Sequence, residues 1–298
     1  MLMKIDMHPL RTLSAISFAA FLITVDAKAQ VTVFSDNYNR GVLSPAPNGA
    51  SYAVAATGDG GASITGNILA LTNDASAAAN ANGSVSVAIP TTSFASPYDP
   101  VLSLDGVVTW NFNMQQVRTD PSGFGGGSYG AAFILAGSAS NFTTGNGYAI
   151  TLGGSGGGDP VRLVSYTAGI ANQTAIITPS SGAFADVGSE YLSVRVTYVS
   201  ATNTWALLGR VDGTTSFNDP ITGTLTSFGT AVNSTYTNIA LNNMGEFWNF
   251  NTAASQIAQF DNVSVVVPEP STWTTGALAV AGLLLNQRRR IVCLAKRA

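Results

Sequence analysis

The chain has 298 residues, of which only 10% are charged, and a formal net charge of −3. Residues 30–267 carry five arginines, no lysine, eleven aspartates and two glutamates, a net charge of −8. This acidic, lysine-free segment excludes nucleic-acid binding, which needs cationic side chains to replace phosphate counterions. The only histidine, His8, and the only cysteine, Cys293, lie outside it. Disulfides, zinc sites and triads that use His or Cys are therefore excluded from this segment as well.

The first 29 residues have the pattern of a secretory signal peptide. Basic residues precede an uncharged apolar run at 13–25 that is too short to span a bilayer comfortably. Ala27 and Ala29 then give the small-x-small pattern that signal peptidase cleaves. We expect cleavage after Ala29 and a mature chain that begins at Gln30. The alternative is an uncleaved N-terminal anchor.

Residues 30–267 are expected to form one all-β domain, an antiparallel β-sandwich of the jelly-roll type. Gly, Ser, Thr and Asn separate short runs that are rich in Val, Ile, Tyr and Phe. In chain order, strands are predicted at 63–71, 84–89, 107–114, 131–135, 148–152, 162–166, 191–199, 205–211, 236–241 and 256–266. The clearest is 191–199, where every second side chain is apolar. Short strands at this spacing indicate a sandwich or a barrel.

Three segments, at 34–40, 66–71 and 260–265, resemble the concanavalin A-like jelly roll of many secreted bacterial proteins. The resemblance implies that the first and last strands lie side by side. It places Asp36 and Asp261 in these paired strands, where they are candidate ligands for a structural calcium ion, which prefers carboxylate and carbonyl oxygens. The alternative is that such side chains bond their own backbone at strand ends. No other cofactor is expected.

Trp110 and Trp248 are the candidates for a sugar contact. Each alternates with asparagine, and in a strand Trp110 shares a face with Phe112 and Trp248 shares one with Phe250. Exposed aromatic faces next to amides suit carbohydrate. The alternative interpretation places both aromatic pairs in the core and their asparagines on the outside.

We expect no enzymatic activity. Because residues 30–267 lack His, Cys and Lys, the remaining catalytic arrangement is a pair of carboxyl groups, as in glycosidases. Glu190 and Glu246 stand far apart in the sequence, and the chain lacks the Glu-x-Asp-x-x-Glu strand of glucanases that share the jelly-roll fold. Aspartates that precede prolines, such as Asp99 and Asp219, are typical of turns.

Residues 268–290 resemble the PEP-CTERM sorting signal of Gram-negative bacteria. The sorting motif consists of Pro268, Glu269 and Pro270, and the membrane stop consists of Arg288, Arg289 and Arg290. Between them, residues 271–287 have the length of a short transmembrane helix, and the arginines should stay in the cytoplasm with the tail 291–298. The resemblance implies recognition by the processing enzyme exosortase. An ordinary unprocessed anchor is the alternative.

These features together predict an exported, non-enzymatic protein of the cell surface or extracellular matrix. Its expected partners are signal peptidase, exosortase and the inner membrane, and the sorting-signal family's association with exopolysaccharide production implies exopolysaccharide as a further partner. A carbohydrate-binding, lectin-like module is the first alternative. A carboxylate-dependent glycoside hydrolase is the second.

Overall fold

The computed structural model describes residues 30–269, except for short segments at 75–80, 96–97, 99–105, 119, 154–157 and 253–255. The predicted cleavage site at Ala27 and Ala29 lies outside the described residues. So does the tail from residue 270 onward, which holds Pro270 and the three arginines at 288–290. Within the described part, no helix is long and apolar enough to cross a membrane.

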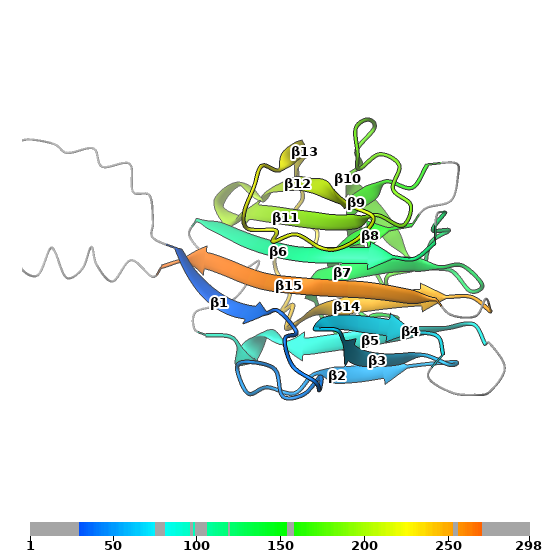
Figure 1. Ribbon diagram of the computed structural model, residues 1–298. Helices are drawn as coiled ribbons and strands as arrows, with labels where there is room; N and C mark the ends of the chain where they lie inside the picture. Colours follow the sequence, from blue (N-terminus) through cyan, green and yellow to red (C-terminus); the bar gives the residue numbers. More distant parts are fainter. Residues whose placement is uncertain are drawn as a thin grey trace, which may run out of the picture.

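The strands form two antiparallel sheets that face each other (Figure 1). Sheet A contains β1 (Gln30–Asp36), β3 (Gly61–Thr65), β4 (Ile68–Thr72), β6 (Val107–Gln116), β11 (Tyr191–Val199), β12 (Thr204–Gly213), β13 (Thr226–Val232) and β15 (Ile257–Pro268). Sheet B contains β2 (Ala53–Ala56), β5 (Gly83–Pro90), β7 (Gly130–Gly137), β8 (Gly147–Leu152), β9 (Val161–Tyr166), β10 (Gln173–Ile177) and β14 (Asn243–Phe250). The short 3₁₀ turns are η1 (Thr91–Ser93) and η2 (Ser200–Thr202). The predicted all-β antiparallel sandwich is confirmed.

Neighbouring strands follow the order β13-β12-β11-β6-β15-β4-β3 in sheet A, where β1 also pairs with β15. Sheet B has the order β10-β9-β8-β7-β14-β5-β2. β1 lies beside β15, with Gln30 opposite Pro268 and Asp36 opposite Val263 (Figure 1). The expected adjacency of the first and last strands is therefore confirmed.

The core lies between the sheets and follows the period-two alternation of the strands. Phe112 of β6 stacks on Phe133 of β7 at 3.9 Å between ring centroids, and Trp110 stacks on Trp205 at 5.9 Å. Trp110 and Trp248 are both 0% exposed. Neither offers a ring face to a sugar. The predicted sugar contact at these two residues is therefore wrong, and both belong to the core. The core cluster contains residues from Val33 to Val267, near both ends of the described part of the chain.

One predicted strand is divided into two. The segment 63–71 forms a hairpin of β3 and β4 because Gly66 and Asn67 adopt φ values of 62° and 65°. Two successive residues with positive φ produce a tight two-residue turn, and Gly and Asn are the residues that tolerate it best. The chain therefore reverses where the alternation alone predicted continuation.

The predicted strand at 236–241 is a turn instead. The backbone N–H of Thr235 donates to the side chain of Asn233, and the Thr237 hydroxyl donates to the Ser234 carbonyl. Such local bonds satisfy the backbone without a neighbouring strand. The apolar residues of the segment still pack inward, and Leu241 is 1% exposed.

Candidate functional site

Two adjoining hollows open on the outer face of sheet A. The first has a volume of about 380 Å³, and its polar lining includes Ser35, Asp36, Asn37, Asp219, Asn262 and Ser264. The second has a volume of about 270 Å³, and its lining includes Asn37, Asn39, Asn67, Ser216, Phe217, Asp261 and Asn262. Asn37 and Asn262 line both. Part of the wall of both hollows comes from residues 214–225, which connect β12 to β13 and which we call the strap.

The hollows lie where β15 changes its partner. One edge of β15 pairs with β4 over 257–260 and with β1 over 263–268, so β4 and β1 lie end to end along it. The residues between these two stretches are Asp261 and Asn262. Against β6 the register shifts between Asp261 and Ser264, so that Asn262 and Val263 form a β-bulge opposite the single residue Phe112.

The bulge turns polar side chains outward. Phe260, before the bulge, and Val263, its second residue, are both buried in the core. The extra residue allows Asp261 and Asn262, which are consecutive, both to line a hollow on the outer face. Asn262 has φ 49°, a left-handed conformation that asparagine tolerates better than most residues.

Asp36 forms the inner wall of the first hollow and is held firmly. Its two carboxylate oxygens accept hydrogen bonds from two guanidinium nitrogens of Arg40, at 2.5 and 2.8 Å. They also accept bonds from the Tyr38 backbone N–H at 2.8 Å and the Tyr52 hydroxyl at 2.7 Å. The Asp36 side chain is fully buried. A metal ion bound by Asp36 would have to displace Arg40.

Asp261 differs from Asp36 because no arginine pairs with it among the described residues. Burial raises the pKa of its carboxyl group to about 6, and the nearby charge of Asp36 adds to this effect. A hydrogen bond from the Asn262 backbone N–H opposes the shift. The described residues contain no group of three acidic, His or Cys side chains placed to hold a metal ion. Asp36, held by Arg40, therefore does not fit a calcium ligand.

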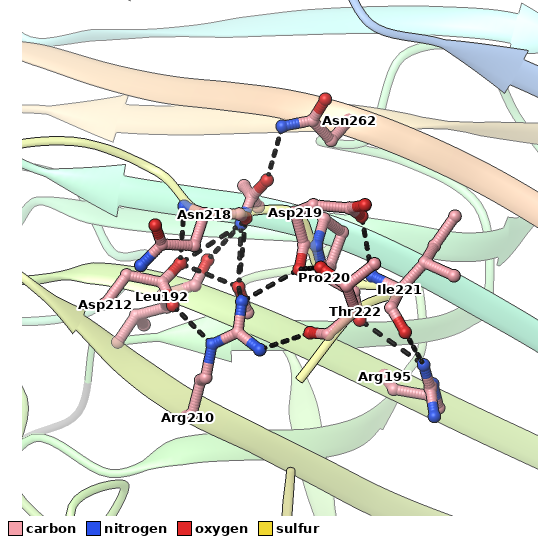
Figure 2. Close-up of polar contacts among 12 residues, drawn as sticks. Leu192, Arg195, Arg210, Asp212, Asn218, Asp219, Pro220, Ile221, Thr222 and Asn262 are labelled. Atoms are coloured by element: carbon pink, nitrogen blue, oxygen red, sulfur yellow. Dashed lines mark hydrogen bonds and ion pairs between the residues drawn. The ribbon is translucent and has the colours of Figure 1, made fainter. Parts of the chain in front are cut away.

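A polar network connects the hollows to the middle of sheet A (Figure 2). The Asn262 amide donates to Asn113 at 2.8 Å, and the Asn113 amide donates to the backbone carbonyl of Asn218 in the strap at 3.0 Å. Arg210 pairs with the buried carboxylate of Asp212 at 2.7 Å. These contacts fix both the bulge and the strap on the same sheet.

Glu246 lies apart from the hollows, inside the sandwich. It is 1% exposed and accepts a hydrogen bond from the Tyr38 hydroxyl at 2.7 Å, while its second carboxyl oxygen has no partner. Burial raises the pKa of Glu246 to about 8, although the Tyr38 bond opposes the shift. Burial therefore favours the neutral form of this carboxyl group, which is enclosed by protein.

The three segments that the jelly-roll resemblance singled out meet at the hollows. Segment 34–40 supplies Asn37, segment 66–71 supplies Asn67, and segment 260–265 supplies Asp261 and Asn262. The sequence did not predict that the strap lines the hollows, because Asp219-Pro220 has the pattern of an ordinary turn. A long polar connection between two strands was the available signal, and its position over the sheet is a tertiary property.

No family model and no curated protein matches this chain. Solved structures with a similar course of the chain include lectin II from Ulex europaeus, with a TM-score of 0.48, 14% identity, and coverage of 80% of this chain and 98% of that one. Another is peanut lectin with a nine-residue peptide, with a TM-score of 0.47, 14% identity, and coverage of 80% and 97%. A third is the CBM2 module of a Lactobacillus casei BL23 phage J-1 evolved Dit protein, with values of 0.47, 11%, 82% and 98%. At this level of similarity they carry no argument about activity.

Proposed function

We propose that this chain is an exported, non-enzymatic carbohydrate-binding protein that its PEP-CTERM tail delivers to the cell surface or the extracellular matrix. The observation that carries the proposal is the pair of hollows on sheet A. Sugars present hydroxyl groups that both donate and accept hydrogen bonds. The Asn37 amide N–H groups can donate to them, and the Asn262 side-chain oxygen can accept from them, because the Asn262 N–H groups are already donated to Asn113 and Asp261. Phe217 and Ile221 add apolar surface for the C–H face of a sugar ring.

The charges around the hollows favour a neutral glycan. Arg40 is paired with Asp36 and Arg210 with Asp212, so these two cations are already neutralised. Asp219 and Asp261 add negative charge to the lining. An acidic polysaccharide would meet net repulsion there. A neutral one would lose only the hydration of polar groups, and new hydrogen bonds to the protein compensate for that loss.

The positions of the carboxyl groups support a binding role over hydrolysis. A glycosidase needs two available carboxyl groups about 5–10 Å apart, on either side of the scissile bond. Asp36 is tied to Arg40, and Glu246 is enclosed between the sheets. Of the acids that line the hollows, Asp219 and Asp261 have no arginine partner among the described residues, and they lie in adjoining hollows. Incubating any bound glycan with the protein and measuring new reducing ends tests the hydrolase alternative.

The sorting part of the proposal rests on the tail sequence. β15 ends at Pro268, opposite Gln30, so the motif begins where the sandwich ends. Glu269 follows directly and does not belong to a strand. This position supports the proposal because an enzyme in the membrane would need to reach the motif without unfolding the domain.

A glycan array tests the binding function. The full chain, purified in mild detergent, should retain neutral oligosaccharides or exopolysaccharide fragments. Asn37→Ala removes one of the two shared amides and should weaken binding about tenfold. A tenfold change in affinity corresponds to about 1.4 kcal/mol, which is within the range for the loss of one hydrogen bond between uncharged groups. Asn172→Ala, an exposed amide in the turn between β9 and β10, is the matched control and should bind as the parent does. Failure to retain any glycan, or equal losses in both variants, would refute the proposal.

A further inference from the structure

The strap is attached to sheet A through its backbone. Four successive carbonyl oxygens accept hydrogen bonds from two arginines of the sheet (Figure 2). They belong to Asp219, Pro220, Ile221 and Thr222. Arg210 donates to the first and the last of them at 2.8 and 2.5 Å, and Arg195 donates to the middle two at 3.3 and 3.2 Å. Because each guanidinium is a rigid fork of donors, these bonds fix the strap on β11 and β12.

The strap's side chains are turned to the hollows. Asp219 and Ile221 line the first, and Ser216 and Phe217 line the second. Ile221 is 56% exposed, so its apolar side chain is accessible at the first hollow. Phe217 is half-buried and meets the ring of Tyr191 edge-on at 4.7 Å. The strap is therefore one continuous wall shared by both hollows.

The two hollows repeat the same chemistry. Each contains an apolar side chain from the strap, a carboxyl group without an arginine partner among the described residues, and the two shared amides. These are Ile221 and Asp219 in the first hollow, Phe217 and Asp261 in the second, and Asn37 and Asn262 at the junction. A repeated set of contacts matches a ligand made of repeated units.

We propose that the two hollows form one groove, which binds at least two linked sugar units of a linear glycan, with the strap as its fixed wall. This inference rests on the proposed carbohydrate-binding function and names the class of ligand. A single sugar fills one hollow and leaves the apolar side chain of the other in water. A linked second unit enters without a further loss of translational freedom, so affinity rises with chain length until both hollows are filled.

The test measures affinity against chain length, using the full chain and calorimetry. The probes are linear oligomers of glucose and of N-acetylglucosamine with one to six units, together with a size series of any glycan that the array retains. Affinity should rise at least tenfold from one unit to the plateau. Phe217→Ala affects the second hollow and Ile221→Ala the first, and each should remove most of this rise. Val232→Ala truncates an exposed apolar residue of β13 outside both hollows and should leave the rise intact.

The outcomes separate the two proposals. If no glycan of any length binds, the proposed function itself is wrong. If monosaccharides bind as tightly as hexasaccharides, the carbohydrate function stands and the groove is refuted. Losses in Phe217→Ala that are equal for one unit and for six units would also refute the groove. Thermal unfolding of each variant checks that lost affinity does not come from lost structure.

Discussion

Replacing Glu246 with glutamine should change how the stability of the sandwich depends on pH. In the folded protein the pKa of Glu246 is raised to about 8 by burial, whereas its ordinary value is 4.5. Between these values the folded state holds a proton that the unfolded state has released, so the free energy of unfolding falls as pH rises. Below pH 4.5 both states are protonated and the contribution is complete. Above pH 8 it is lost.

The size of the stability loss follows from the interval between the two pKa values of Glu246, 4.5 in the unfolded and about 8 in the folded protein. Each pH unit corresponds to about 1.4 kcal/mol, so the loss between pH 4.5 and pH 8 is about 5 kcal/mol. This is a large share of the roughly 5–15 kcal/mol that stabilise a typical domain. Glutamine has nearly the same shape and can still accept the hydrogen bond from Tyr38, but it does not titrate. The variant should lack this part of the pH dependence.

Urea unfolding of residues 30–269, followed by tryptophan fluorescence at pH 5, 6, 7 and 8, measures the effect. Asp159 and Asp261, whose pKa values are raised to about 6, titrate in both proteins. The difference between parent and Glu246→Gln therefore isolates Glu246. The parent should be the more stable protein at pH 5 and the less stable at pH 8. Parallel profiles over the whole range would contradict the assignment of a neutral, buried Glu246.

Three further predictions concern the strap, the bulge and the tail. Arg195→Gln removes the guanidinium donors to two strap carbonyls, so amide hydrogen exchange at Asn218, Asp219, Ile221 and Thr222 should speed up severalfold while exchange in β6 stays the same. Unchanged exchange in the strap would contradict its attachment by arginine. Asn262→Val places a β-branched residue at φ 49° and should destabilise the domain by about 1–3 kcal/mol, whereas Asn262→Gly should cost less, as thermal unfolding can show. Glu269→Ala should leave membrane insertion intact and block processing by exosortase; normal processing, seen by intact mass, would argue for a simple anchor.

Much of the sandwich follows from local patterns in the sequence. Within the predicted strand 191–199, apolar and polar residues alternate from Leu192 to Tyr198 because β11 has one face in the core and one directed away from it. The same rule predicts that the asparagines between Trp110 and Met114 face outward, and Asn113 does so to reach the strap. Such alternation directly encodes which face of a strand is buried.

Other elements are not marked by an alternation of apolar and polar residues in the sequence. β13 is a mostly exposed edge strand, so its residues carry no period-two pattern, and β2 is similar. The division of 63–71 into two strands depends on the backbone conformation of Gly66 and Asn67 rather than on hydrophobicity. These features are decided by turns and by neighbours in space, which a single sequence does not display.

The candidate site could be predicted only in part. The paired end strands brought together the segments around Asn37 and Asn262, as the resemblance implied. The burial of Glu246 also follows from the sequence, because period-two alternation puts it on the same face as Trp248 and Phe250. The polar network beneath the strap, in contrast, joins Asn113 to Asn218 across about a hundred residues of chain. Neither spacing nor composition indicates such a contact.

The central claim is that the groove on sheet A binds carbohydrate. The most direct measurement is a ¹⁵N–¹H NMR titration of residues 30–269 with the oligosaccharide that binds best on the array. We expect amide shifts to change at Asn37, at Asp261 and Asn262, and along the strap at 216–219 and 221. Changes confined to the outer face of sheet B, or no changes with any glycan, would contradict it.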